Sequence, residues 1–143
     1  MHYDDKQLLG DIYQLAETGL EAAGTVLQKT DDPALREEIE EQYNDYSQAK
    51  AKAEQSLIDS GAFPKGNSPF QKATMWGAIQ MQTLGECSDD HIAEIMIKGT
   101  NTGIVDLTHD ISQCENASDS TKRFAERFIK TEQRHIENLK AFL

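Results

Sequence analysis

Apolar and small residues recur along this chain at alternating spacings of four and three, which is the repeat of helices packed side by side. Four segments carry this repeat and predict long helices, over residues of about 4–29, 33–60, 89–115 and 118–142. In the last segment the apolar stripe also contains an acid and an imidazole, at Glu132 and His135. The pattern therefore predicts an all-α protein with polar groups in part of its core.

The stretch from Gly61 to Cys87 interrupts the repeat and divides the chain into two pairs of helices. Gly61 can end the second helix in a left-handed conformation. A short helix is predicted over residues 69–84, because Ser68 can cap it and Pro69 suits its first position. This arrangement predicts an antiparallel four-helix bundle whose second and third long helices are joined by a long crossover containing a short helix.

The chain has 143 residues, the length of one domain, and we predict a single four-helix-bundle domain over residues 1–143. Its formal charge is −11, from 25 acidic and 14 basic residues. This charge repels phosphate groups and argues against nucleic acid and anionic membranes as partners. No segment approaches the run of about eighteen apolar residues that a membrane-spanning helix needs.

The first residues, MHYDDKQLLGD, contain neither a basic start nor an apolar run of signal-peptide length. The two cysteines, Cys87 and Cys114, flank the third predicted helix, so they lie about 40 Å apart at about 1.5 Å per residue. That separation excludes a disulfide between them and favours free thiols in a reducing compartment. We therefore expect a cytoplasmic protein.

Most acidic residues are expected on solvated helix faces. Glu17 and Glu21 lie off the apolar stripe of the first helix. The second helix carries its acids mostly around its own stripe, at Glu37, Glu38, Glu40, Glu41, Asp45 and Glu54. Asp106 and His109 have the spacing of a metal-ligand pair, yet the stripe of the third helix turns both away from the core. We interpret all of these as surface residues.

Glu132 and His135 form the one pair of potential metal ligands that the periodicity turns inward. Counting along the predicted helices brings Gln42, Tyr46 and Thr100 to the same level of the bundle. A buried polar group without a partner costs about 1–3 kcal/mol, so groups in one layer are expected to hydrogen-bond to one another. These five residues are therefore predicted to form a buried polar layer, within which Glu132 and His135 are the candidate metal ligands.

The helix hairpins, the proline-bearing crossover and the inward Glu132-x-x-His135 together resemble the ferritin superfamily. More narrowly, the chain resembles the small bacterial ferritin-like four-helix-bundle proteins of unassigned function, over nearly its full length. The features that carry the closer resemblance are Glu21-Ala22-Ala23, Gly66, Ser68, Trp76 and the sequence IAEIMIKGTNTGI from Ile92 to Ile104.

In ferritin-like di-metal proteins, two helices each supply a glutamate and the other two each supply a Glu-x-x-His. The resemblance thus implies iron or manganese held by carboxylate and imidazole ligands. This chain matches one contribution, at Glu132 and His135. Its second helix has Glu41-x-x-Asn44 instead, and its third has Thr100 at the central position. Because the ligand set is incomplete, we expect no cofactor.

Two functions compete. The first, which we predict, is a non-catalytic binding or assembly module, with a homo-oligomer or a protein partner. The alternative is a divergent iron- or manganese-dependent oxidase or peroxide-handling protein that uses Glu132 and His135. Such a site would need further ligands, from Glu21, Asp45, Asp106 or His109. Inward placement of those acids within ligand distance of His135 would favour the alternative.

Overall fold

The computed structural model describes residues 1–66 and 87–143, which form four long α-helices and no β-strand. The helices are α1 (Tyr3–Leu27), α2 (Pro33–Asp59), α4 (Asp89–Gln113) and α5 (Asp119–Leu139), followed by a short 3₁₀ helix, η1 (Lys140–Phe142). Over these residues the protein is all-α, as the hydrophobic repeat predicts. Each long helix ends slightly earlier than predicted, and the helix expected over residues 69–84 lies outside the described residues.

Short sequence signals set where the helices begin and end. The carboxylate of Asp32 accepts a backbone N–H from the first turn of α2 at 2.9 Å, and Pro33 occupies the start of that helix, where a missing N–H costs nothing. The hydroxyl of Ser118 accepts the backbone N–H of Thr121 at 3.3 Å before α5. After α2, Gly61 has a φ of 81°, the left-handed conformation that glycine adopts most readily.

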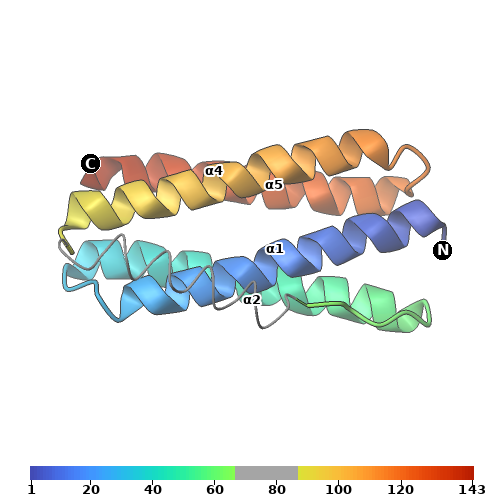
Figure 1. Cartoon of the computed structure of the whole chain (residues 1–143), viewed down its shortest axis with the longest axis horizontal. Coiled ribbons are helices and arrows are strands. Elements are labelled where there is room, and N and C mark those ends of the chain that lie inside the picture. Colours follow the sequence, from blue (N-terminus) through green and yellow to red (C-terminus); the bar gives the residue numbers. More distant parts are fainter. Residues whose placement is uncertain (67–86) are drawn as a thin grey trace.

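The four helices lie side by side in two antiparallel hairpins (Figure 1). One hairpin is α1 with α2, and the other is α4 with α5. α1 packs against α4, and α2 packs against α5, so the hairpins face each other along their length. α2 ends and α4 begins at opposite ends of the molecule (Figure 1), and the two helices therefore run in the same direction.

The core of the described residues consists of two apolar clusters with a polar layer between them. Cluster one includes Leu8, Ile12, Ala16, Ala53, Leu57, Leu107, Phe124 and Phe128. Cluster two consists of Ala23, Val26, Leu35, Ile39, Ile92, Met96 and Leu139. Buried polar residues lie between the two clusters on three of the helices. They are Gln42 on α2, Thr100 on α4, and Glu132 and His135 on α5.

The start of α1 is tied to the turn between α4 and α5. Asp5, which is buried, accepts the backbone N–H of Ser118 at 2.8 Å, and Asp4 accepts that of Asn116 at 2.9 Å. Burial raises the pKa of Asp5, but hydrogen bonds from Ser118 and Thr121 outweigh it and leave the pKa below its usual value. An ionised carboxylate thus joins the two hairpins at this end.

All four long helices carry charged residues along their length. Within the described parts of the chain, none of the helices combines the length and the apolar character needed to cross a membrane.

Candidate functional site

Four polar side chains form a continuous hydrogen-bonded chain across the middle of the core. The Gln42 amide donates from Nε2 to the Thr100 hydroxyl at 2.9 Å and to the Tyr46 hydroxyl at 3.0 Å. The Tyr46 hydroxyl donates in turn to Oε2 of Glu132 at 2.6 Å. Because Gln42 and Tyr46 lie one turn apart on α2, this chain connects α2 to both helices of the second hairpin.

The Tyr46 ring fits into the layer because α1 has no side chain at Gly19. A β-carbon at Gly19 would lie 2.5, 2.6 and 2.7 Å from three carbon atoms of that ring, closer than non-bonded carbons approach. The ring of Phe128 also packs against Tyr46, with centroids 6.2 Å apart. Glycine in α1 therefore lets the phenol lie across the core and reach Glu132.

His135 is held by two carboxylates of α2 and not by the other members of the layer. Its Nδ1 lies 2.8 Å from Oε1 of Glu38, and its Nε2 lies 2.7 Å from Oδ2 of Asp45. Asn138 donates to the other Glu38 oxygen at 3.2 Å, and Arg134 donates to Asp45 at 3.2 Å. The imidazolium form carries an N–H at each nitrogen and fits both contacts. Because His135 has no exposed surface, these contacts fix its ring.

The interpretation of Glu38 and Asp45 as solvated acids is wrong. Glu38 is buried, and the side chain of Asp45 is only 31% exposed. Glu38 lies four residues before Gln42 and Asp45 lies three residues after it, so both share the Gln42 face of α2. That shared face is the signal by which the sequence could have identified them as partners of His135.

Glu17 is also buried, which corrects its interpretation as a surface residue. Its carboxylate lies against Gly66. Three residues earlier on α1, the Gln14 side chain donates to the backbone carbonyl of Lys65 at 2.8 Å. The chain that follows α2 therefore passes over this face of α1. Glu21, one turn further along, is partly buried.

The environment of the layer shifts the proton equilibria of two of its members. Burial raises the pKa of Glu132 to about 7, although the Tyr46 hydrogen bond and His135 pull it down. Removal from water disfavours the charged form of a carboxyl group. Burial, and then the neighbouring Glu132 carboxylate, raise the pKa of Tyr46 well above its usual value. Glu132 therefore exchanges its proton near neutral pH, while Tyr46 remains a hydrogen-bond donor.

The layer contains more hydrogen-bond acceptors than donors. Among the described side chains, Oε1 of Gln42 is the one buried polar atom that lacks a hydrogen-bond partner. Glu132 receives the Tyr46 hydroxyl on Oε2, and its Oε1 accepts no hydrogen bond from the described residues. Both amide hydrogens of Gln42 and the hydroxyl hydrogen of Tyr46 are already used. The Thr100 hydroxyl accepts from Gln42 and keeps its own hydrogen. The layer therefore has one unused donor for two unused acceptors.

The arrangement of these side chains does not fit two iron or manganese ions. A ferritin-like centre needs ligands from four helices directed at a shared point. Here Glu38 and Asp45 face different nitrogens of His135. Over residues 1–66 and 87–143, no three His, Cys, Asp or Glu side chains are placed to hold one ion.

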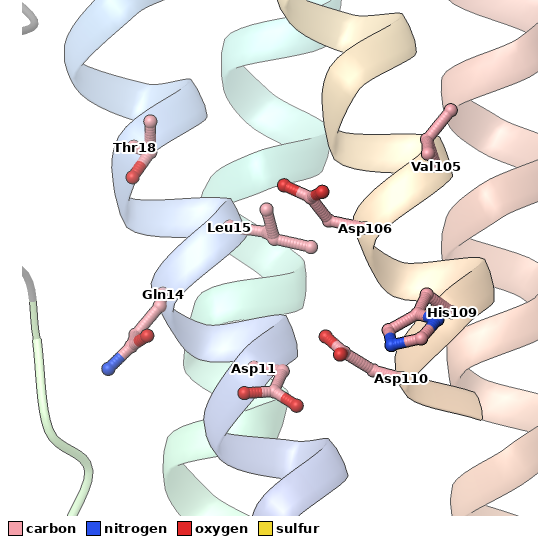
Figure 2. A pocket seen from close by; sticks show the side chains of 8 residues that line it. All are labelled: Asp11, Gln14, Leu15, Thr18, Val105, Asp106, His109 and Asp110. Carbon is pink, nitrogen blue, oxygen red and sulfur yellow. The ribbon is translucent and has the colours of Figure 1, made fainter. Parts of the chain in front are cut away.

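Asp106 and His109, which also have the spacing of a metal-ligand pair, are exposed on α4, as the sequence predicts. Both line a pocket of about 500 Å³ between α1 and α4 (Figure 2). Figure 2 shows Asp110 of α4 directed across this pocket toward Asp11 of α1. Burial, and then the nearby Asp110 carboxylate, raise the pKa of Asp11 to about 6. This pocket is acidic and open, and it does not include Glu132 or His135.

A further cavity, of about 560 Å³, lies between α1 and α4 beside the polar layer. Three members of the layer, Tyr46, Thr100 and Glu132, contribute to its wall. The apolar part of the remaining wall includes Leu15, Ala22, Ile95, Met96 and Phe128, and its polar part consists of Thr18, Lys98, Thr102 and Asp106. The polar layer can therefore be reached from the space between these two helices.

No family model matches the chain, and no curated protein matches it. Among solved structures, the chain is similar to the crystal structure of a DUF305 fragment from Deinococcus radiodurans. The TM-score is 0.74, and the match covers 98% of this chain and 95% of that chain at 15% sequence identity. The two chains share a helical fold over nearly their full lengths, and at this identity the likeness extends to the fold alone.

Proposed function

We propose that this protein is a ferritin-like four-helix bundle with an incomplete di-metal ligand set, and that it acts as a non-catalytic binding or assembly module. This proposal rests on the contacts of His135 with two carboxylates. Both ring nitrogens face carboxylate oxygens, at 2.8 and 2.7 Å, so neither is directed at an open coordination position. Because a histidine binds metal through an unprotonated nitrogen, this pairing supports a structural role for His135.

The composition of the layer supports the same proposal. Gln42 and Thr100 occupy central positions on α2 and α4 where a di-metal protein would need carboxylates or imidazoles. Their side chains are bonded to each other at 2.9 Å. Glu132, the remaining acid of the layer, is bonded to Tyr46. Among the described residues, these bonds leave Oε1 of Gln42 and Oε1 of Glu132 without a partner, which are fewer oxygen ligands than a di-metal centre needs.

Metal content tests this proposal. The full chain would be purified without a histidine tag and without chelators, after growth with added iron and manganese, and its metals would be counted by elemental mass spectrometry. We expect no stoichiometric metal, and a melting temperature that a chelator leaves unchanged. One or two ions per chain, lost in His135→Ala and kept in His109→Ala, would overturn the proposal. His109 is the matched control because it is an exposed histidine.

One observation favours the alternative function. Asp45 lies 2.7 Å from His135, which is the inward placement that a divergent metal site would need. With Glu38 and Glu132, it brings three acids and one imidazole into the same part of the core. The second candidate is therefore an iron- or manganese-dependent oxidase or peroxide-handling protein with an irregular site at Glu132 and His135. The same metal analysis decides between the two.

The assembly part of the proposal concerns a homo-oligomer or a protein partner. Two exposed apolar side chains lie close together in sequence, Ile58 in the last turn of α2 and Phe63 in the segment that follows it. Exposed apolar side chains that join into a contiguous patch commonly mark an association surface. Light scattering on the full chain at several concentrations tests for a homo-oligomer, and a monomer throughout would restrict this part of the proposal to a different partner.

A further inference from the structure

The cavity between α1 and α4 combines an apolar wall with a buried carboxyl group. Its volume of about 560 Å³ falls within the range of about 300–1,000 Å³ that is usual for small-molecule sites. Glu132 lines it although only 3% of that residue is exposed. Glu132 is the buried acid of this wall, whereas the other charged residues of the wall, Lys98 and Asp106, are exposed. Its carboxyl group therefore gives the buried end of the cavity a preferred position for a charged or polar group.

The buried end of the cavity offers an open acceptor at Glu132. The donors of the wall lie elsewhere on it or are already engaged: Lys98 is exposed and its ammonium group pairs with Glu94 at 2.7 Å. Oε1 of Glu132 accepts nothing from the described residues, and the Tyr46 hydroxyl hydrogen is already directed at Oε2. Behind this wall, the buried Oε1 of Gln42 has no partner. A group that enters here therefore gains most if it brings N–H donors and a positive charge. An ammonium group supplies three donors and has no acceptor.

We propose that this cavity binds a primary amine with an apolar tail. Its ammonium group contacts Glu132, Tyr46 and Thr100, and its tail lies along the apolar wall formed with Ile95 and Met96. A cation compensates a buried carboxylate, whereas an acid as head group would be repelled and an alcohol would bring no charge. The formal charge of −11 also raises the concentration of cations near the protein.

This inference rests on the proposed function, because the amine requires a Glu132 that holds no metal. It goes beyond that function by naming the class of ligand. The space for the tail depends on small residues, since Gly99 of α4 and Gly19 of α1 both line the cavity.

Two glycines allow a matched test of the cavity. A β-carbon at Gly99 would meet no heavy atom within 4 Å, and the same holds for Gly10 of α1. Gly99 lines the cavity and Gly10 does not. Gly99→Leu and Gly10→Leu therefore add the same side chain to a helix at an open position, but only Gly99→Leu obstructs the site.

Isothermal titration of the full chain with hexylamine, 1-hexanol and hexanoate tests the proposal. We expect saturable binding of one hexylamine per chain, at least about tenfold tighter than either control, as a charge-assisted hydrogen bond supplies. Glu132→Gln should weaken hexylamine binding by at least about tenfold while keeping the shape of the side chain. Gly99→Leu should weaken it by a similar factor, and Gly10→Leu should leave it unchanged.

The outcomes separate this inference from the proposed function. If the metal-free chain binds no hexylamine, or binds 1-hexanol or hexanoate as tightly, the amine site is wrong and the proposed function is untouched. Equal binding by wild type and Gly99→Leu would likewise overturn the inference, and this comparison keeps Glu132 intact if Glu132→Gln folds poorly. Stoichiometric metal lost in His135→Ala would overturn the proposed function itself.

Discussion

The Tyr46 hydroxyl donates to Oε2 of Glu132 at 2.6 Å and connects α2 with α5 through the centre of the core. This bond lowers the pKa of the carboxyl group, but burial outweighs it and raises the pKa from 4.5 to about 7. Between these two values the folded protein binds a proton that the unfolded chain has released. The free energy of unfolding therefore falls as the pH rises through this window, and the full loss is reached above the pKa of Glu132 in the folded protein.

Glu132→Gln removes this titration and keeps an acceptor for Tyr46. We expect the variant to be more stable than wild type at about pH 8, by up to about 3 kcal/mol, and similar to it at about pH 4, because a shift of one pKa unit corresponds to about 1.4 kcal/mol. Urea unfolding across this pH range measures the difference. Glu126→Gln, at an exposed position of α5, is the control. A difference between wild type and Glu132→Gln that does not change with pH would contradict the prediction.

Gly19→Ala is expected to destabilise the protein although alanine favours helix. The new β-carbon would overlap the Tyr46 ring, so the ring must move and its bond to Glu132 must break or lengthen. Overpacking of this kind costs about 1–3 kcal/mol. Gly10→Ala is the control, because it meets nothing within 4 Å and should gain up to about 1 kcal/mol from helix propensity. Thermal unfolding compares the two, and equal stabilisation by both would show that the ring is free to shift.

Gln42 and Thr100 could be placed in the core from the sequence because they fall in phase with aliphatic residues on both sides. The same reasoning predicted that Glu132 and His135 point into the core, and it predicted the four long helices and their capping residues. Helical periodicity is less informative on α2, because acidic residues are so frequent there that the buried Glu38 cannot be told from its solvated neighbours. Glu38 and Asp45 were missed for that reason, although their spacing from Gln42 places them on its face.

The burial of Glu17 could not be predicted from the repeat at all. Helical periodicity reports which face packs against other helices, and it contains no information about a loop that returns over the outer face. The contact between Gln14 and Lys65 shows the chain after α2 lying there. Long-range contacts of this kind depend on where the chain goes after a turn, which no local pattern encodes.

His135→Leu is expected to cost about 3–5 kcal/mol, because it removes the ring nitrogen that contacts the buried Glu38 carboxylate. Arg134→Leu is the matched control. Arg134 contacts the same Asp45 at 3.2 Å, but its side chain is 61% exposed, and such surface pairs contribute at most about 1 kcal/mol. Urea unfolding near neutral pH measures both variants. A loss below about 1 kcal/mol for His135→Leu would show that its two carboxylate contacts do not stabilise the fold.

Asp4 and Asp5 contact the segment that connects α4 with α5. Two backbone amides of that segment therefore report whether the start of α1 stays in place. The N–H groups of Asn116 and Ser118, which lie between the two helices, donate to these carboxylates and not to a backbone carbonyl. Their protection from hydrogen exchange therefore lasts only while the start of α1 stays in place. Amides in the middle of α5 stay protected until the helix itself opens. Comparing the two sets of exchange rates would distinguish separation of the hairpins from melting of the helices, without any label added to the protein.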